Sequence, residues 1–497
     1  MIDLGDLPPS WTVAPLSELT EYVQRGKSPK YTDISDLPVI NQKCVRWGGL
    51  DTKHVKYIHS DQQRSTEAVR FLRVDDILWN STGTGTIGRA CLYRGEFPQA
   101  VVDSHVTIVR SDHRLLEPKY LHFFIMSSAV QDEIENIQSG STNQVELSRK
   151  AILELPIPLP PPGEQRRIVE KIEALFAELD KGEESLRQVQ TLLARYRQSV
   201  LKAAVTGELT ADWRARHAGK LEHGRDLLAR ILKARRENWQ GRGKYKEPVE
   251  PDTSSLPELP EGWVWATVGQ IADVIGGLTK NSKRVSMPLR RPMLRVANVY
   301  QNRLDLSDIH ETGLTESELE RALLKPLDLL VVEGNGSKDQ IGRMALWRGE
   351  IPGAVHQNHL IKVRLIEKGM VEFLLWWFQS PDGRQMIEMV ASSSSGLHTL
   401  SISKIESFAV PLPSLDEAQE ITSQVREALL RIEQLNIYTE AELRRSAALR
   451  RSILKDAFVG RLVPQDPTEE PATELIARIR AQRSAEPHKS GRRKLTA

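Results

Sequence analysis

The chain contains one long unit twice, and this duplication restricts its possible folds more than any other feature. Ile87-Gly88-Arg89 recurs as Ile341-Gly342-Arg343, and Pro158-Leu159-Pro160 recurs 253 positions later as Pro411-Leu412-Pro413. A repeat of this length is a repeated domain and not a solenoid module. The other matched motifs are Leu7-Pro8 and Trp11 with Leu259-Pro260 and Trp263, Arg94-Gly95-Glu96 with Arg348-Gly349-Glu350, and Val205, Gly207 and Leu209 with Phe458, Gly460 and Leu462. We expect two related globular units that present the same kind of surface twice, which suits a target such as duplex DNA.

Length and composition set the class of protein. A chain of 497 residues has room for about three or four domains. Cys44 and Cys91 are too few for a disulfide framework or a Cys-rich zinc site, so we expect a reducing, cytoplasmic compartment. The first residues have no basic or apolar leader, and no run of about eighteen apolar residues occurs. The sequence therefore predicts a protein that is neither secreted nor membrane-spanning.

Five segments follow from the change of pattern along the chain. Short apolar runs such as Ile77-Leu78-Trp79 alternate with Gly, Ser, Asn and Asp clusters, which is typical of short strands joined by loops. We expect a strand-rich domain at 1–155, a central helical region at 156–258, a second strand-rich domain at 259–410, a C-terminal helical region at 411–483 and a basic disordered tail at 484–497.

Within these segments the pattern predicts individual elements. Pro156 to Pro162 should stop regular structure, because proline lacks an amide donor and keeps its predecessor extended. The shorter elements that we expect are strands at 39–40, 77–79, 90–93, 106–109 and 329–332, helices at 118–136, 225–239 and 371–378, and a short amphipathic helix at 473–483 that docks on a partner or on the chain's own start.

Two long heptad patterns are the clearest periodic signal. The first runs from Pro162 to Val205, and the second from Leu415 to Val459 with a polar centre at Thr439 and Glu442. The expected seam residues are Ile168, Ile172, Leu175, Leu179, Leu186, Val189, Leu193, Tyr196, Val200 and Ala203, with Ile421, Val425, Ile432, Leu435, Leu449 and Ile453 in the second copy. The predicted fold class is α+β: two mixed α/β domains in tandem, each followed by a long helix, with the helices paired as an antiparallel coiled coil.

Charge distribution is more informative than the net charge of +2. Arg214 to Lys246 contains eleven Lys or Arg against three acidic residues, and Lys489 to Lys494 adds four basic residues. Such runs can hold phosphate, but a solvated helix face or a disordered tail explains them equally well.

The sequence contains no convincing active site. Gly83-Thr84-Gly85-Thr86-Ile87-Gly88 fits the dinucleotide pattern G-x-G-x-x-G, but Arg89 to Tyr93 reads as a strand where the phosphate site needs a helix. The second copy does not keep the spacing, and no P-loop occurs. Histidine pairs such as His54 with His59 lack partners at metal-ligand spacing, and Asp75-Asp76 resembles strand-entry turn chemistry.

The order of these motifs resembles the specificity subunit of type I restriction-modification systems. The resemblance rests on the two-copy layout, the Trp11 and Trp263 openings, Glu164-Gln165-Arg166 and Leu209 to Trp213, and it covers nearly the whole chain. The second copy departs from it, because it reads Glu417-Ala418-Gln419.

The resemblance implies a non-catalytic protein that binds double-stranded DNA through two target recognition domains, one for each half of a split asymmetric site. The helices would set the unread spacer. It also implies two modification (methyltransferase) subunits and restriction/translocase subunits as partners. S-adenosylmethionine, ATP and Mg would be bound by those partners, and no cofactor or metal by this chain.

Direct readout of DNA needs Arg, Lys, Asn, Gln, Ser and Thr on loops that reach the major groove. The candidates in the first domain are Lys27, Lys30, Asn80, Ser81, Thr84, Arg89, Ser141, Thr142, Asn143 and Gln144. The candidates in the second are Lys280, Asn281, Lys283, Asn298, Asn335, Ser337, Lys338, Arg343, Ser394 and His398. Arg89 and Arg343, being duplicated, could equally be structural and anchor the turn.

Two rival classes stay open at this point. A nucleotide-dependent enzyme built on the Gly83 turn would show saturable cofactor binding by the isolated chain. A non-sequence-specific coiled-coil scaffold would bind DNA without base preference, although a scaffold needs only the helices and not two large strand-rich domains.

Lys338 provides a first test of the DNA-binding candidates. We expect Lys338→Ala to weaken binding to specific DNA and to reduce the salt slope, because a lysine–phosphate contact releases counterions. Titration of labelled duplex at several salt concentrations measures both quantities, and unchanged values would remove Lys338 from the candidates.

Overall fold

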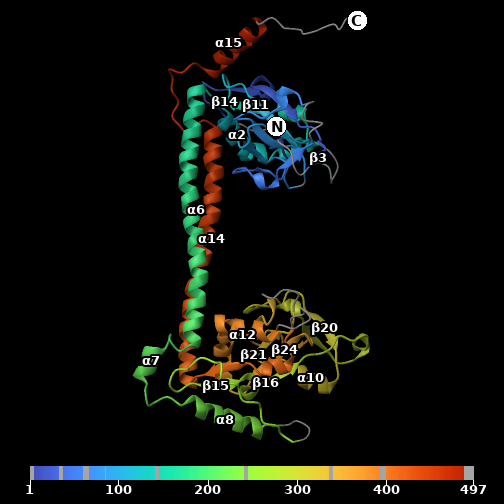
Figure 1. Ribbon diagram of the computed structural model, residues 1–497, viewed down its shortest axis with the longest axis vertical. Coiled ribbons are helices and arrows are strands. Elements are labelled where there is room, and N and C mark those ends of the chain that lie inside the picture. The colour runs from blue at the N-terminus through green and yellow to red at the C-terminus, as the bar shows by residue number, and fades with distance from the viewer. Residues whose placement is uncertain are drawn as a thin grey trace. The chain divides into compact units, whose positions relative to one another are not determined.

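The computed structural model divides into two compact units (Figure 1). Unit 1 comprises residues 1–187 and 440–497, and unit 2 comprises residues 188–439. The structure describes residues 5–32, 37–59, 66–83, 85–139, 145–239, 244–334, 340–391 and 399–485. Each unit contains one strand-rich domain and part of each long helix.

Unit 1 is built on two four-stranded sheets. The first is antiparallel in the order β2-β11-β8-β9, and the second has the order β10-β4-β7-β3 with β10 parallel to β4. The strands of the two sheets are β2 (Thr20–Arg25), β11 (Val106–Ser111), β8 (Ile77–Asn80), β9 (Ala90–Leu92), β10 (Val101–Val102), β4 (Pro38–Ile40), β7 (Lys56–Ile58) and β3 (Tyr31–Thr32). Short pairs join β5 (Val45–Arg46) to β6 (Gly49–Leu50), and β12 (Gln138–Ser139) to β13 (Glu146–Leu147).

Unit 2 repeats this plan. Its antiparallel sheet has the order β16-β24-β21-β22, and its second sheet has the order β20-β17-β23. The strands are β16 (Ala272–Gly276), β24 (Leu360–Leu365), β21 (Asp328–Val332), β22 (Met344–Trp347), β20 (His310–Gly313), β17 (Arg290–Leu294) and β23 (Val355–His356), with a hairpin of β18 (Val299–Tyr300) and β19 (Arg303–Leu304). The domain helices are α9 (Val268–Ile271), α10 (Glu316–Ala322), α11 (Val371–Gln379), α12 (Pro381–Ala391) and α13 (Ile402–Glu406).

The helix expected at 118–136 is not continuous. The chain forms α2 (Pro118–Met126), α3 (Ser128–Gln131) and α4 (Ile134–Ile137), followed later by α5 (Arg149–Leu153). Ser127 ends α2 because its backbone turns extended and its hydroxyl donates to the carbonyl of Phe124 at 2.7 Å. A local side-chain hydrogen bond therefore replaces the next helical turn.

The prolines at 156–162 also behave differently from the prediction. Pro156–Leu159 is strand β14, which pairs antiparallel with β1 (Thr12–Pro15). Unit 2 repeats the pair with β15 (Val264–Thr267) and β25 (Ala409–Leu412). A two-stranded pair leaves one edge of each strand free, so proline can occupy the side that donates no ladder hydrogen bond.

The two long helices match their predicted bounds closely. α6 spans Pro162–Val205 and α14 spans Leu415–Phe458, each with 44 residues. In unit 1 the start of α6 meets the end of α14, where Arg450 lies 2.5 Å from Asp180 and Ser446 donates to Glu183 at 2.7 Å. In unit 2 the end of α6 and the start of α14 share one core cluster, which includes Leu201 and Ile421. The pairing is antiparallel, as predicted.

The seam itself differs in its middle from the predicted one. Val189, Tyr196, Leu435 and Leu449 were expected inside, but they are 38%, 55%, 48% and 45% exposed. Thr439 and Ser446 are buried instead, and Gln190 and Arg197 are half-buried. Polar residues therefore share the buried middle of the helices with Leu193 and Ile432, while several expected seam residues are exposed.

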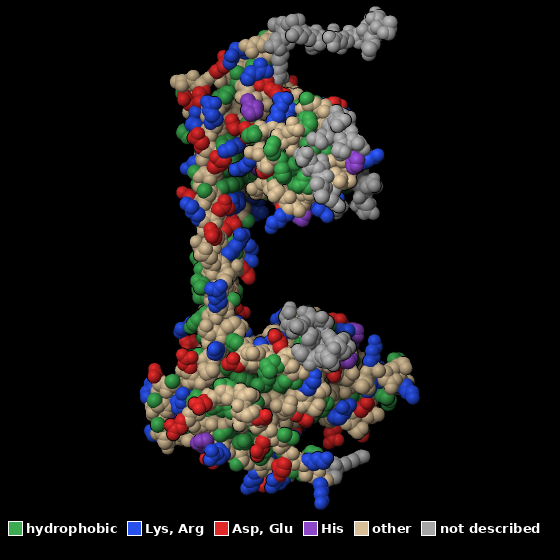
Figure 2. All heavy atoms as spheres, in the orientation of Figure 1, with side chains coloured by type: hydrophobic (Ala, Val, Ile, Leu, Met, Phe, Trp, Pro, Cys, Tyr) green, Lys and Arg blue, Asp and Glu red, His purple; other side chains and the backbone are tan. Residues whose placement is uncertain are grey.

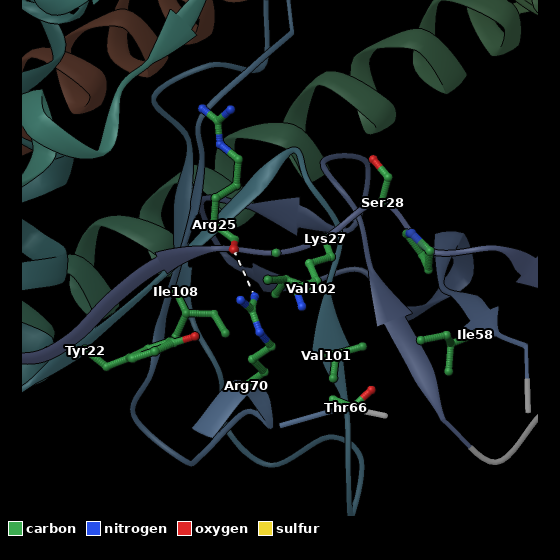
Figure 3. A pocket seen from close by; sticks show the side chains of 12 residues that line it. Tyr22, Arg25, Lys27, Ser28, Ile58, Thr66, Arg70, Val101, Val102 and Ile108 are labelled. Carbon is green, nitrogen blue, oxygen red and sulfur yellow. Dashed lines mark hydrogen bonds between the residues drawn. The ribbon is translucent and has the colours of Figure 1, made fainter. Parts of the chain in front are cut away.

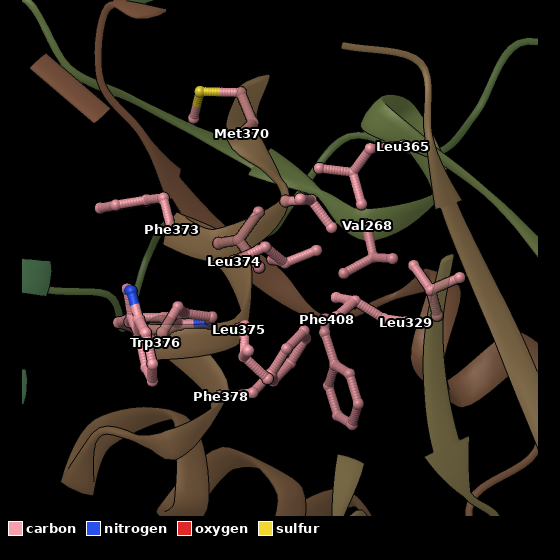
Figure 4. Close-up of a cluster of buried hydrophobic side chains, with 14 of the residues drawn as sticks. Val268, Leu329, Leu365, Met370, Phe373, Leu374, Leu375, Trp376, Phe378 and Phe408 are labelled. Atoms are coloured by element: carbon pink, nitrogen blue, oxygen red, sulfur yellow. The ribbon is translucent and has the colours of Figure 1, made fainter. Parts of the chain in front are cut away.

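Each domain packs its sheet and helices into one large apolar core. In unit 2 the core joins α11 and β21 to Val268 and Phe408 (Figure 4). In unit 1 it includes residues of α15 (Ala472–Ala485). The amide of Ala472 donates to the carbonyl of Ser10 at 3.0 Å, so this helix docks on the chain's own start.

A buried glutamate at the start of each long helix ties the domain to the helices. In unit 1, Glu164 accepts hydrogen bonds from the Trp11 indole at 3.0 Å and from the Gln465 amide at 2.6 Å. In unit 2, Glu417 accepts from the Trp263 indole at 2.9 Å. It also accepts from Thr210 at 2.7 Å and from the Arg214 guanidinium at 2.5 Å. We call each arrangement a Glu–Trp clip.

The two clips differ in charge, which gives a matched stability test. Glu417→Gln should lower the free energy of unfolding by about 2 kcal/mol, because Arg214 is left without its carboxylate partner. Glu164 has no cation in hydrogen-bond contact among the described residues, and burial raises its pKa. A raised carboxyl pKa penalises the ionised form, so stability falls as the pH rises from the ordinary carboxyl pKa through the raised value.

Glu164→Gln should therefore lower the free energy of unfolding at pH 7 by less than Glu417→Gln does. It should also reduce the decrease in stability with rising pH that ionisation of Glu164 causes. Urea unfolding of the full chain, followed by tryptophan fluorescence between pH 4 and pH 7, measures both. Equal destabilisation by the two substitutions would show that the Arg214 ion pair adds nothing.

Candidate nucleic-acid interface

The glycine-rich segment after β8 is a strand turn. Gly83, Gly85 and Gly88 have φ of 101°, 78° and 87°, a backbone region that favours glycine. The next element is strand β9, and the Trp79 indole donates to the carbonyl of Gly88 at 3.0 Å. Gly342, with φ of 63°, makes the corresponding turn between β21 and β22. No helix follows that could face a pyrophosphate, as the sequence predicted.

Arg89 and Arg343 both hold their own loops. Arg89 donates to the carbonyl of Gly85 at 2.8 Å. Arg343 donates to the carbonyl of Val296 at 3.0 Å and to Gln340 at 3.0 Å. Both side chains are half-buried, so an anchoring role is well supported for the pair.

Three predicted DNA-contact residues are buried, and we withdraw them. The Ser81 hydroxyl lies 2.5 Å from that of Thr107, and Asn80 donates to the carbonyl of Gln42 at 3.0 Å. Asn298 accepts from the amide of Arg295 at 2.8 Å and donates to two carbonyls. All three are at most 3% exposed. Their polar groups hold loops together and cannot reach a base edge.

Five predicted residues are exposed, in equivalent places of the two domains. Lys27 and Lys30 follow β2, and the Lys27 side chain is 69% exposed. Lys280, Asn281 and Lys283 follow β16, where Asn281 caps a short helical turn by accepting from the amide of Lys283 at 3.0 Å. These residues remain predictions. The candidates outside the described residues are Thr84, Ser141, Thr142, Asn143, Gln144, Asn335, Ser337, Lys338, Ser394 and His398.

A basic groove in unit 1 was missed by the sequence analysis. It has a volume of about 490 Å³. Its lining includes Lys43, Lys53, Lys56, Tyr31, Asn41, Gln42, Asp103 and His105. The Lys56 ammonium stands 4.5 Å from the centre of the Tyr31 ring. Three lysines within residues 43–56 were the available signal, but only folding brings their separate loops together.

The electrostatics of this groove favour an anionic ligand. Asp103, the one carboxylate among the described residues that line the groove, is 2% exposed and accepts from the Tyr31 hydroxyl at 3.0 Å and from the amide of His105 at 2.9 Å. Burial raises the pKa of Asp103. The two hydrogen bonds satisfy this carboxylate inside the protein, while the lysines of the groove are exposed to solvent.

The corresponding surface of unit 2 is the β18–β19 hairpin. Tyr300 to Arg303 are all exposed, and Asn302 has φ of 56°, a left-handed conformation that asparagine adopts more readily than most residues. The Arg303 guanidinium lies 4.6 Å from the Tyr300 ring centre, and that of Arg343 lies 5.5 Å away. The exposed Arg303 guanidinium and the amide side chains of the loop form a surface that can contact phosphates and base edges.

Basic side chains do not form one continuous face in the view of Figure 2. Lys and Arg stand among Asp and Glu over both strand-rich domains. Within the described residues there is no group of three His, Cys, Asp or Glu that could hold a metal ion. A search of the same residues finds no helix long and apolar enough to cross a membrane.

Comparison with known proteins gives a consistent result. Residues 8–188 match the family model described as the type I restriction modification DNA specificity domain. The chain is 25% identical to the EcoKI specificity subunit of Escherichia coli K12, over 99% of both chains. It is also 25% identical to the StySPI specificity subunit of Salmonella potsdam, again over 99% of both.

Solved structures share the fold. A chain from a structural study of complex assembly and conformational transition in a type I R-M system superposes with a TM-score of 0.60 at 17% identity. That match covers 92% of this chain and 100% of the other. The HsdS subunit of Thermoanaerobacter tengcongensis superposes with a TM-score of 0.50 at 17% identity, covering 92% and 98%.

The resemblance found in the sequence is thereby confirmed: the chain is similar to specificity subunits of type I restriction enzymes over nearly its whole length, and residues 8–188 match the DNA specificity domain. The solved structures share its fold.

The basic groove yields a direct prediction. Lys43→Ala combined with Lys53→Ala should weaken DNA binding and lower the salt slope by about one for each lysine–phosphate pair that the substitutions remove. Lys150→Ala is the matched control, because that side chain is 81% exposed in the same unit but does not line the groove. Fluorescence anisotropy at several salt concentrations measures the slope, and equal slopes for both variants would contradict the assignment.

Proposed function

We propose that the chain reads a bipartite, asymmetric DNA site, with one half contacted by each repeat. The observation that carries this proposal is the duplication of one domain with basic and amide side chains on equivalent loops. The β2–β3 loop and the basic groove serve in unit 1, and the β16–β17 loop and the β18–β19 hairpin serve in unit 2. Different side chains at equivalent places suit two different half-sites.

The paired helices are proposed to set the unread spacer between the halves. α6 and α14 each continue without a break for 44 residues, and both units contain part of each helix. A continuous helix rises about 1.5 Å per residue and is stiffer than a loop. Half-sites on one face of B-DNA are about 34 Å apart or multiples of that distance, so a stiff connection favours one spacing.

The outside of the helices in unit 2 supports docking of other subunits. Several large apolar side chains point into solvent there. They are Val189, Leu192 and Tyr196 of α6, and Leu430, Leu435, Ile437 and Tyr438 of α14. Exposed apolar side chains on adjoining turns mark protein-interaction surfaces. We assign this surface to the two modification subunits, with restriction/translocase subunits joining the assembly.

Catalysis is proposed to belong to those partners. The modification subunits would bind S-adenosylmethionine and methylate adenine, and the restriction/translocase subunits would bind ATP and Mg. This chain would then act in the cytoplasm as a non-catalytic component that determines where the partners act.

Methylation mapping tests the proposal. The chain is co-expressed with its neighbouring modification and restriction genes, and methylated adenines are mapped across the host genome with and without it. We expect a bipartite motif that vanishes on deletion of this chain. Exchange of residues 12–159 for the corresponding domain of a relative should change one half of the motif and preserve the other half and the spacer.

Two outcomes would contradict the proposal. Methylation that does not depend on the chain would favour a coiled-coil scaffold without sequence reading. A domain exchange that changes both halves would show that the repeats do not read separately.

A further inference from the structure

Unit 1 contains a small cavity beside the loop that follows β2 (Figure 3). Its volume is about 130 Å³. Its walls are mainly apolar and are formed by Tyr22, Ile58, Val101, Val102 and Ile108. Lys27 and Ser28 also line it, and they belong to the loop whose lysines we predicted to contact DNA. The cavity therefore adjoins the proposed DNA-binding surface.

One guanidinium group in this cavity, that of Arg70, has a buried nitrogen without a hydrogen-bond partner among the described residues. The Arg70 side chain is 19% exposed, and it donates to the carbonyl of Arg25 at 3.5 Å (Figure 3). The buried nitrogen is its Nε. Glu67 stands 3.5 Å from that nitrogen without hydrogen-bond geometry. A buried donor without an acceptor is costly, so a ligand that brings an acceptor is favoured.

The size and walls of the cavity select the ligand. A water molecule needs about 10–15 Å³ of such space, so the cavity holds a group of about ten non-hydrogen atoms. Arg25 and Lys27 also line the cavity, but Arg25 pairs with Glu146 at 2.8 Å and Lys27 with Glu67 at 3.7 Å. The apolar walls therefore favour a ligand with apolar faces over phosphate. A nucleobase has the right size, apolar faces, and ring-edge acceptors that a guanidinium recognises.

The second repeat fills the corresponding place with its own side chains. Strand pairing shows which residues correspond. His356 corresponds to Val102, because His356 pairs with Leu294 where Val102 pairs with Ile40. Lys362 corresponds to Ile108, because Lys362 pairs with Leu330 where Ile108 pairs with Leu78. Lys362 is fully buried and donates to the carbonyls of Arg321 and Leu323 at 2.9 and 3.0 Å.

Arg321, one residue before the position that aligns with Arg70, donates to the carbonyls of Gly276 and Gly277. In repeat 2, hydrogen-bonded side chains of the protein itself therefore occupy the place that is a cavity in repeat 1. The cavity is a particular property of repeat 1.

We propose that the Arg70 cavity binds one nucleobase of the DNA half-site that repeat 1 reads, with the Arg70 guanidinium on its acceptor edge. The inference rests on the proposed function and adds to it a base that leaves the stack. Free nucleotides have the same chemistry, and the experiment separates the two sources.

The experiment uses the chain assembled with its modification subunits and duplexes that carry the mapped target. Each base of the first half-site is removed in turn as an abasic site, and binding of the unaltered chain is compared with that of Arg70→Ala. We expect Arg70→Ala to weaken binding to the intact duplex about tenfold. At one position the abasic duplex should abolish this effect, because the base that Arg70 contacts is gone.

Two further variants keep the result interpretable. Ile108→Lys places the residue of repeat 2 in the cavity and serves as the second variant if Arg70→Ala unfolds unit 1. It should also weaken binding to the intact duplex, and the abasic duplex at the same position should abolish that effect. Lys150→Ala is the surface control and should be additive at every position. Thermal unfolding with added dAMP, dCMP, dGMP or TMP tests the free-nucleotide source.

The proposal would be overturned if the effects of Arg70→Ala and Ile108→Lys add to the effect of base removal at every position. Stabilisation by a free nucleotide together with such additivity would also overturn it, and would assign the cavity to free nucleotides. These results are distinguishable from failure of the proposed function. If methylation still follows a bipartite motif, only the cavity inference fails.

Discussion

The buried carboxylate at the start of each long helix is the contact on which the rest of the architecture depends. Glu164 joins the first turn of α6 to Trp11 at the opening of the domain and to Gln465 beyond the end of α14. Glu417 does the same for α14, Trp263 and the segment beyond α6. Three distant parts of the chain thus meet at one acceptor. A glycine supports each clip, because Gly207 and Gly460 both have φ of 73° and a Cβ at either would clash with the proline before the tryptophan.

The clip explains why the protein can carry two different recognition surfaces on one frame. Domain cores, sheets and helix contacts are repeated almost element for element, while loop residues differ between the copies. Val102 and Ile108 of unit 1 correspond to His356 and Lys362 of unit 2, which are buried and hydrogen-bonded internally. These positions differ between the repeats, while the Glu–Trp hydrogen bond of the clip is the same in both.

Much of this frame could be predicted from the sequence, because it follows from periodicity and duplication. The bounds of α6 and the turns at the glycines could be predicted in this way. The middle of the helix seam could not be predicted, because Val189 and Tyr196 fit a heptad in sequence but are exposed in the fold. The sequence also did not show which of the DNA-contact candidates are buried. Asn298 and Lys283 are both polar loop residues, and only the fold shows that one fastens its loop while the other faces solvent.

The discontinuity of unit 1 has a consequence for synthesis on the ribosome. Unit 2 is one continuous stretch of residues 188–439, whereas unit 1 needs residues 440–497 as well as 1–187. Its core includes Trp11 and Ile168 from the early part of the chain and Leu454, Phe458 and Leu475 from the late part. At about 5–20 residues per second, roughly 10–50 s separate the emergence of these two groups. During that interval the nascent first domain exposes the apolar surface that α14 and α15 later cover, so helices made later complete a domain that was begun earlier.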